Sequence, residues 1–403
     1  MTRVLQLTNK PVWPPVEGGP MAMAAMTKAL LESGFEVKVL SVSTPKFPFV
    51  PVPENHPYLH KAHYETVDID TRIKPWQAFL NLFSSRSYHI KRFFSQAFVH
   101  RLSEVLQEQR YDLVIMETVY LTPYLDAITH AAPGIPVILR AHNIEHLIWK
   151  RITSGEKNPL KRWYLGHLTN KLQREEIHCL NRFRAILPIT GVDALWFQSF
   201  VPHCQVKAIP FGIRSNPDEP ITPETISFPI KAYHLGSMDW YPNLEAVTWL
   251  LKSCWAQVES QLPEIELFLA GRNMPREILK QEMHGVHIMG EVPDAQEFIR
   301  DKHMLIAPIF SGSGIRIKIL EAMAMGKVVL TTPVGAEGIE YTHGENILIF
   351  RDCRDLLNLL KALMSKPVEM PRIGGNARML VEQFYNPEKL AVELKKFLQT
   401  VIS

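Results

Sequence analysis

The stretch MLIAPIFSGSGIRIKILEAMAMGKVVLTT, residues 304–332, predicts one strand, a glycine turn, a helix and a second strand. Residues 304–310 are an apolar run typical of a buried strand, and SGSG after it is typical of a turn. In the helix expected next, Ile315, Ile319 and Met323 recur at helical spacing and define a face that packs on a core. Residues 327–332 form the next strand. The stretch therefore predicts parallel strands joined by a crossover helix.

Short apolar runs alternate with helical patterns along the whole chain, which is typical of a parallel sheet covered on both faces. The runs begin at Arg3, Phe35, Tyr111, Ile135 and Arg184 in the first half, and at Lys231, Glu264, Val286, Met304, Lys327 and Asn346 in the second. Proline-rich residues 213–229 separate the halves and disfavour regular structure. We expect an α/β fold of two Rossmann-like, doubly wound domains, residues 1–212 and 230–385, with a C-terminal helix over residues 386–403 that packs back on the first domain.

The amino-acid composition of the chain excludes some classes of function. The chain has 403 residues, 46% hydrophobic and 21% charged, as soluble globular proteins do. Its net charge of +3 (44 basic minus 41 acidic residues) argues against wholesale binding of nucleic acid. Four widely separated cysteines predict free thiols in a reducing compartment. Since the first apolar run is too short for a signal peptide and no run has a spanning length, we expect a cytoplasmic protein.

The turn and helix at residues 311–326 combine the features of an anion site. Gly314 lets backbone amides approach a ligand, and the start of a helix favours an anion. Arg316 and Lys318 add positive charge there, and Glu321, one turn on, could accept hydrogen bonds from a ribose diol. Phosphate and ribose together predict a nucleotide. The alternative is a surface pair of Lys318 and Glu321, which would contribute only about 0.2–0.5 kcal/mol.

These residues also resemble the donor-binding signature of family 4 (group 1) glycosyltransferases, in GSGIRIKILEAMAMGKVVLTTPVGAEGI. EGGP, LRAHNIEHLIW, LPITGVDA, LGSMDWYPN and GEVPD agree, in the family's order. The resemblance implies the GT-B fold, two Rossmann-like domains facing across a cleft, with residues 1–212 on the acceptor side and residues 230–385 on the nucleotide-sugar donor side. It also places Glu321 on the donor's ribose. The family's first glutamate falls on Ser313, so its contact to the transferred sugar is not carried over. The family's Arg and Lys after the first strand of the second domain are absent, and Arg316 and Lys318 are expected to neutralise the diphosphate instead.

Further candidate site residues follow other predicted strands. Gly18 and Gly19 open a helix, and the resemblance implies that they lie beside the donor diphosphate or the acceptor; the alternative is a tight turn. His142 follows the strand at residues 135–140, and the resemblance assigns it to the sugar; the alternative is a polar loop. Arg272 is a candidate for phosphate, and the backbone at Gly290 and Val292 is a candidate for the base. A plain turn is the alternative for these three.

No metal or other cofactor is expected. Asp68 and Asp70 match an Asp-x-Asp metal motif, but we interpret them as the end of a strand, and no His or Cys cluster has zinc spacing.

Residues 78–102 and 149–174 interleave aromatic and basic side chains, including Phe83, Phe93, Phe94, Phe98 and Arg101, and then Lys161, Arg162 and Trp163. This pattern suits a helix on an anionic membrane surface. It suits equally an amphipathic helix with its aromatics in the core. If the first interpretation holds, the protein is peripheral to the inner face of the membrane and its acceptor is lipid-linked.

The sequence therefore predicts a transferase that moves a sugar from a nucleotide-sugar donor to a glycan or lipid-linked acceptor, in polysaccharide or glycoconjugate biosynthesis. Retention of configuration is implied by the resemblance alone. Two alternatives stay open: a nucleotide-sugar epimerase on the same fold, and a catalytically impaired nucleotide-sugar-binding protein.

Overall fold

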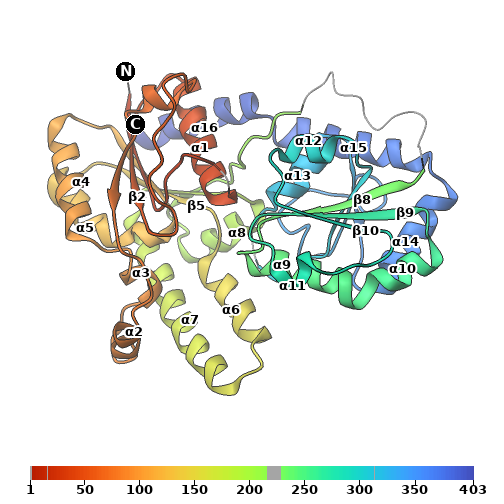
Figure 1. Ribbon diagram of the computed structural model, residues 1–403. Coiled ribbons are helices and arrows are strands. Elements are labelled where there is room, and N and C mark those ends of the chain that lie inside the picture. Colours follow the sequence, from red (N-terminus) through yellow and green to blue (C-terminus); the bar gives the residue numbers. More distant parts are fainter. Residues whose placement is uncertain (1, 16, 216–227, 313) are drawn as a thin grey trace. The chain divides into compact units, whose positions relative to one another are not determined.

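The computed structural model describes residues 2–15, 17–215, 228–312 and 314–403 and divides into two compact units (Figure 1). The first unit comprises Met1–Gly212 and Pro387–Ser403, and the second comprises Ile213–Asn386. Each unit has its own parallel sheet, so the predicted pair of doubly wound, Rossmann-like domains is confirmed. Most of the linker predicted at residues 213–229 lies outside the described residues.

The sheet of the first unit has the order β3-β2-β1-β4-β5-β6-β7, and every pairing is parallel. The five predicted strands are present because their apolar runs are buried on both faces. β3 ends at Asp68, which confirms the interpretation of that residue as a strand end. The two-residue β7 was not predicted because so short a strand leaves no periodic pattern. The strands are β1 (Arg3–Thr8), β2 (Glu36–Ser43), β3 (Glu65–Asp68), β4 (Leu113–Glu117), β5 (Val137–Ala141), β6 (Ala185–Pro188) and β7 (Gln205–Val206).

Helices cover both faces of this sheet. One face packs on α1 and on the C-terminal α16, whose Leu394 and Leu398 share a core cluster with Leu30 of α1. The hydroxyl of Ser33, just after α1, donates to the carbonyl of Ala391 over 3.1 Å. The helices are α1 (Gly18–Glu32), α2 (Pro75–Asn81), α3 (Tyr88–Lys91), α4 (Gln96–Glu108), α5 (Leu125–Ala131), α6 (Glu145–Gly155), α7 (Pro159–Cys179), α8 (Gly191–Phe200) and α16 (Pro387–Ile402).

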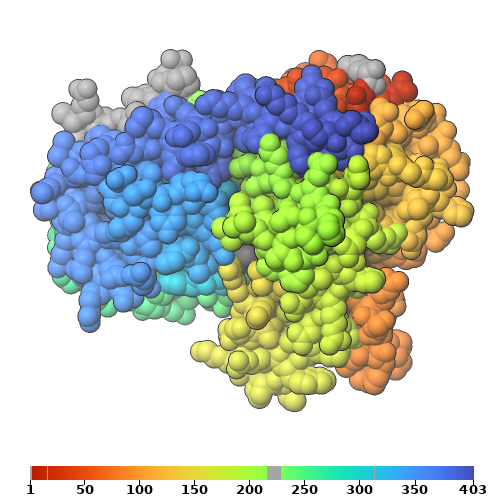
Figure 2. All heavy atoms as spheres, turned by 180° about the vertical axis from the view of Figure 1, so that it is seen from behind, coloured from red at the N-terminus to blue at the C-terminus, as the bar shows by residue number. Residues whose placement is uncertain are grey.

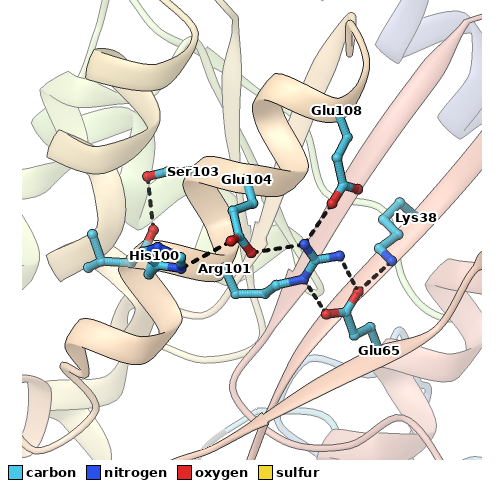
Figure 3. A network of polar contacts seen from close by, with 8 residues as sticks. Lys38, Glu65, His100, Arg101, Ser103, Glu104 and Glu108 are labelled. Carbon is cyan, nitrogen blue, oxygen red and sulfur yellow. Dashed lines mark hydrogen bonds and ion pairs between the residues drawn. The ribbon is translucent and has the colours of Figure 1, made fainter.

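A charged network fastens α4 to the edge of the sheet (Figure 3). The guanidinium of Arg101 donates to Glu65 of β3 and, over 2.6 Å, to Glu108, and Lys38 of β2 donates to Glu65 over 2.7 Å. These cations, Arg101 first, lower the pKa of Glu65 to about 2. Arg101 is thus engaged within the fold, and the sequence pattern wrongly grouped it with cations available to a membrane.

The second unit repeats the topology with the order β10-β9-β8-β11-β12-β13, again all parallel. All six predicted strands are present. The helix predicted from residue 315 begins two residues later, because Gly312 and Gly314 have positive φ and keep the chain in a turn until Arg316. Ile319 and Met323 are buried, as expected. The strands are β8 (Ile230–Leu235), β9 (Ile265–Ala270), β10 (Val286–Gly290), β11 (Met304–Ala307), β12 (Val328–Thr331) and β13 (Leu348–Ile349). The helices are α9 (Tyr241–Trp249), α10 (Trp255–Gln261), α11 (Arg276–Leu279), α12 (Ala295–Arg300), α13 (Ile317–Ala324), α14 (Cys353–Ser365) and α15 (Glu369–Phe384), with a π-helical turn at Leu250–Cys254.

The prediction of four free thiols is wrong for Cys254 and Cys353. These residues form a disulfide, with Cα atoms 5.3 Å apart, that links the π-helical turn to the start of α14. They are 99 residues apart in the sequence, so no spacing motif indicated the pair. Cys179 and Cys204 are free, and the argument from cysteine usage to a reducing compartment now rests on them alone.

A backbone contact fixes α15 against the end of α13. A Cβ added at Gly374 of α15 would lie 2.0 Å from the carbonyl oxygen of Gly326, which no structure tolerates. Only glycine therefore fits this crossing, although a glycine inside a helix ordinarily costs stability. The contact holds the helix that carries Lys318 and Glu321.

We expect Gly374→Ala to lower the free energy of unfolding of the second unit by about 1–3 kcal/mol, because the clash outweighs the better helix propensity of alanine. Urea unfolding followed by hydrogen exchange, which separates the two units, measures the change.

Gly166→Ala in α7 is the matched control. Its Cβ would lie 3.8 Å from a methyl carbon of Thr153, an ordinary contact, so alanine should stabilise the first unit by about 0.5–1 kcal/mol. Equal effects of the two substitutions would contradict the packing argument.

Candidate functional site

The topology of each unit defines where a ligand can bind. Strand order reverses between β1 and β4 in the first unit and between β8 and β11 in the second. Helices leave the sheet in opposite directions at such a point, and open parallel sheets bind ligands outside the carboxyl ends of these strands. The predicted site residues that the structure describes follow β1, β5, β9, β10 and β11 or start the next helix, so they lie at these carboxyl edges.

Lys318 is the centre of a polar cluster in the second unit. Its ammonium donates to the side-chain oxygen of Asn243 over 2.6 Å and lies 3.3 Å from Nε2 of His234. The side chain of Asn243 is fixed by a further hydrogen bond, because its amide nitrogen donates to the carbonyl of Ser237 over 2.7 Å. The cation of α13 is thus held by residues of β8 and α9, and both partners are neutral acceptors.

His234 has a defined tautomer. Its Nδ1 lies 2.9 Å from the carbonyl oxygen of Ile306, which can only accept, so Nδ1 carries the proton and Nε2 presents a lone pair to Lys318. Burial, and then the charge of Lys318, lower the pKa of His234 well below its ordinary value. Burial and the nearby Arg316 lower the pKa of Lys318 to about 7, while Glu321 opposes the change. The lysine therefore lacks an anionic hydrogen-bond partner and gains one if a phosphate binds.

Two glycines make room for this cluster. A Cβ at Gly236, just after β8, would lie 2.7 Å from the ammonium of Lys318 and 2.6 Å from the amide nitrogen of Asn243. A Cβ at Gly271, just after β9, would lie 1.8 Å from the carbonyl oxygen of Gly236. The backbones after β8 and β9 therefore approach as closely as they do because both positions lack side chains.

The remaining donor candidates flank the cluster. The carbonyl of Arg272 accepts from the backbone of Met238 over 2.9 Å, and the carbonyl of Gly290 accepts from Gly271 over 2.7 Å, so these loops are joined. Val292 is two residues past the end of β10 and is half-buried. Ser313 lies outside the described residues.

Arg316 is buried at the start of α13. Its guanidinium donates to the carbonyl of Gly314 over 2.8 Å and lies 5.3 Å from the ring centroid of Trp240. The N–H groups of Ile317 and Lys318 have no hydrogen-bond acceptor among the described residues. This helix start therefore offers two backbone donors, a guanidinium and an ammonium to an anion.

Glu321 lies one turn beyond Lys318. Burial raises the pKa of this carboxyl, against the effect of Lys318, and the side chain has no hydrogen bond or ion pair with any described residue. A half-buried carboxylate in this state can accept hydrogen bonds from a ligand's hydroxyl groups. The alternative of a surface ion pair with Lys318 is not what the structure contains, because the ammonium bonds to Asn243 instead.

A second polar cluster lies at the carboxyl edge of the first sheet, around His142. Nε2 of His142 lies 2.5 Å from Glu117, the last residue of β4, and the other oxygen of Glu117 accepts from Gln6 of β1 over 2.8 Å. Thr27 of α1 donates to Gln6 over 2.7 Å. Nε2 therefore donates to the carboxylate, which leaves Nδ1 of His142 for another partner. Glu117 and Gln6 are fully buried, and the amide of Gln6 also donates to the carbonyl of Met23 over 3.1 Å.

Two further residues, close in sequence to Glu117 and His142, have unusual properties. Thr118, directly after Glu117, has φ of 89°, a rare conformation for a β-branched residue, and such strain concentrates at functional sites. Glu145, three residues after His142, accepts from the hydroxyl of Tyr120 over 2.7 Å, and burial raises its pKa to about 7.

Gly18 and Gly19 form the first turn of α1, as predicted. The ammonium of Lys10 lies 3.8 Å from Glu17, and a Cβ at Gly19 would lie 3.8 Å from the same ammonium. Burial lowers the pKa of Lys10. The helix start therefore has a cation beside it that the sequence analysis did not single out.

The structure thus brings Arg316, Lys318 and Glu321 together, and separately pairs His142 with Glu117. His234, Glu117 and Gln6 were missed. A signal for each existed, since a polar residue inside an otherwise apolar strand is buried and must find a partner. Within the described ranges, no group of three or more His, Cys, Asp or Glu side chains could hold a metal ion, and Asp70 pairs with Arg72 over 2.9 Å. None of the described helices is long and apolar enough to cross a membrane.

Comparison with known proteins relates these sites to a family. Residues 230–366 match the family model "Glycosyl transferases group 1". A protein of Klebsiella pneumoniae, described as an uncharacterized 44.6 kDa protein in the cps region, is 24% identical in an alignment over 312 residues that covers 72% of this chain and 75% of that protein.

Solved structures of glycosyltransferases share the fold over the whole chain. Sucrose-phosphate synthase of Thermosynechococcus elongatus has a TM-score of 0.71 at 16% identity and covers 100% of this chain and 99% of its own. TarM has a TM-score of 0.67 at 11% identity, over 100% and 99%. Anabaena HepE in complex with UDP-glucose has a TM-score of 0.63 at 14% identity, over 99% and 100%. Over residues 230–366 the chain is therefore similar to the group 1 glycosyltransferases, and over its whole length it has the GT-B fold of these solved glycosyltransferases.

Proposed function

We propose that the second unit binds the diphosphate and ribose of a nucleotide-sugar donor, and that the protein transfers the sugar with retention of configuration to a glycan or lipid-linked acceptor. One observation carries the donor assignment. Lys318 is held at the start of a helix by neutral Asn243 and His234, with a carboxylate that has no described partner one turn away. A nucleoside diphosphate supplies both missing partners, an anion for the lysine and a diol for Glu321.

The chemistry assigned to the second unit is stabilisation of the leaving group. When the bond from the sugar to the diphosphate breaks, negative charge grows on the phosphate oxygens. Arg316, Lys318 and the N–H groups at the start of α13 are donors that stabilise such charge, and they are held in position before the reaction. We assign Gly314 to the same phosphates, Arg272 to a further phosphate contact, and the backbone at Gly290 and Val292 to the base. Ser313, at the position of the family's first glutamate, stays a donor-binding candidate without that residue's contact to the transferred sugar.

The chemistry assigned to the first unit is orientation of the sugar. Nδ1 of His142 is available to a hydroxyl group because Nε2 is occupied by Glu117. Gly18 and Gly19 at the start of α1 are proposed to approach the diphosphate or the acceptor. Retention follows from the resemblance: the leaving phosphate takes the acceptor's proton on the face of attack, so no separate base is assigned.

The names of related proteins indicate what to test first. HepE has been crystallised with UDP-glucose, and TarM of S. aureus with UDP and α-GlcNAc-glycerol. A uridine diphosphate sugar is therefore the first donor to try. The relative from a cps region supports a role in polysaccharide or glycoconjugate biosynthesis. We also propose that the protein works in the cytoplasm.

Two other functions use the same donor site. An epimerase would convert the nucleotide sugar with no acceptor, and an impaired protein would bind it without turnover. Measuring free nucleotide released with and without an acceptor mixture separates all three. The transferase requires release that depends on the acceptor.

Glu321→Gln should weaken binding of UDP-glucose by about 1.5–3 kcal/mol, because the amide is a poorer acceptor for a ribose diol than a carboxylate is. Titration calorimetry measures it, with Glu277→Gln, an exposed glutamate of α11, as the matched control. Unchanged affinity of Glu321→Gln would remove this residue from the donor site.

Affinity for UDP-glucose should fall as pH rises from about 6.5 to about 8.5. In the protein without donor, Lys318 has a pKa of about 7 and is therefore mostly charged at the lower pH. Above pH 7 the ammonium has lost its proton, so binding of the donor must be accompanied by uptake of a proton on Lys318. The loss should approach tenfold per pH unit, and calorimetry in buffers of different ionisation enthalpy should detect the proton taken up. In Lys318→Arg, which stays charged, the decline should disappear even if binding is weaker throughout. A flat profile for the wild type would contradict the role of Lys318.

Glu117→Gln should lower kcat by roughly 10–100-fold, the usual effect of losing a partner that orients a functional histidine, and should leave the affinity for UDP-glucose nearly unchanged. Glu117→Asp keeps a carboxylate and should recover part of the rate. If both variants only lower the melting temperature, the pair of His142 and Glu117 is structural.

A further inference from the structure

An apolar face on α2 is left outside every core of the first unit. Trp76, Phe79, Leu80 and Phe83 stand at i, i+3, i+4 and i+7, so they share one side of the helix and its extension. Trp76 is 68% exposed and Phe83 is 81% exposed, and the other two are at least half exposed. Ile73, just before the helix, is exposed as well. We call these five residues the α2 face.

The α2 face is held outward by contacts on the opposite side of the helix. There the small Ala78 packs with Tyr88 and Leu168. The buried ammonium of Lys171 on α7 donates to the carbonyl of Asn81 over 2.5 Å and of Leu82 over 3.0 Å, which satisfies the C-terminal end of α2. The helix therefore buries an alanine and presents a tryptophan and two phenylalanines, the reverse of an ordinary amphipathic helix.

The aromatic rings of the α2 face contact each other and, in the part of the chain that the structure describes, no other aromatic ring. Trp76 stacks on Phe79 with centroids 5.8 Å apart, and Phe79 meets Phe83 edge-on at 5.9 Å. Phe93 and Phe98, which the sequence pattern grouped with them, are buried in the first unit. The core interpretation is thus confirmed for those two and is wrong for Phe83 and Phe94, which are exposed.

The start of α7 adds a second exposed apolar group, Leu160 and Trp163. Contacts between α7 and residues 78–88 bring both segments to the same end of the first unit, where they appear in orange and yellow-green in Figure 2. Exposed aromatic side chains on two neighbouring helices form a surface that a single copy of this unit leaves in water.

The side chains around this surface are mostly cationic, which favours an anionic partner. Residues 71–103 contain no Asp or Glu, and residues 148–174 contain one, Glu156. Exposed Lys91, Lys157 and Arg162 make no ion pair with described residues. Arg101 and Lys171 are engaged within the fold, Arg72 and Lys74 pair with Asp70, Arg86 pairs with Glu175, and Lys161 pairs with Glu156. The other cations of the two segments are Lys91, Arg92, Lys150, Arg151, Lys157, Arg162 and Arg174.

We infer that the α2 face, with Leu160 and Trp163, inserts into the headgroup region of an anionic bilayer. Tryptophan and phenylalanine side chains favour that boundary, and nearby cations are attracted to anionic lipid. This docking does not depend on the transfer reaction. It would bring the enzyme to a lipid-linked acceptor, which is the finer part of the proposed function.

Vesicle sedimentation tests the inference with the full-length protein. The wild type should sediment with vesicles of phosphatidylglycerol and phosphatidylcholine, should sediment weakly with phosphatidylcholine alone, and should be released as salt is raised. Trp76→Ser/Phe79→Ser/Phe83→Ser should lower partitioning by about tenfold or more. Lys91→Gln/Lys157→Gln/Arg162→Gln should lower it less and should reduce its dependence on salt.

Leu195→Ser/Val368→Ser/Val392→Ser is the matched control, since it removes three exposed apolar side chains elsewhere. It should sediment like the wild type, and circular dichroism should show all variants folded. Equal sedimentation of the aromatic variant and this control would overturn the inference. A wild type that does not sediment with anionic vesicles would also overturn it. So would soluble dextran sulfate that displaces the wild type and the aromatic variant from the vesicles equally well. None of these readouts uses a sugar donor, so the result is independent of the donor proposal.

Discussion

Parallel strand pairing is the constraint on which both candidate sites depend. It places the end of every strand at the same edge of its sheet, so residues distant in sequence become neighbours without any local signal. Gln6 and Glu117 are 111 residues apart and hydrogen-bonded, and Lys318 reaches Asn243 across 75 residues. In both units the edge holds polar side chains that are buried and bonded to one another. Such networks are favourable only when their members are satisfied, which fixes the geometry of the groups around them.

The two sites use this constraint for different kinds of chemistry. The second unit surrounds a cation with neutral partners, so an anion can replace interactions of moderate strength by stronger ones. The first unit holds a histidine against a buried carboxylate, which an amide holds in turn, so the ring is oriented and its second nitrogen is left for another partner. The former arrangement suits binding of a charged group and the latter suits orientation of a hydroxyl group.

The strands and the fold class could be predicted because buried parallel strands are continuous apolar runs, and the glycine turn with Arg316, Lys318 and Glu321 could be predicted because those residues are local in sequence. His234 and Glu117 are each marked as polar residues in an apolar strand, but this signal does not reveal the partner, so their contacts could not be predicted. The same limit applies to the disulfide between Cys254 and Cys353. Helical spacing also could not tell which aromatics face inward: Phe98 is buried and Phe83 is exposed, although both lie in one predicted amphipathic segment.

The return of α16 to the first unit makes the second unit an insertion within the first. The polypeptide completes the second unit at Asn386, and only residues 387–403 then supply the helix that covers α1 and part of the first sheet. During synthesis on the ribosome, an apolar face of the first unit therefore stays uncovered until the whole second unit has been made. A fragment that stops at Gly212 would keep that face permanently. An isolated first unit would need residues 387–403 joined to its end by a short linker.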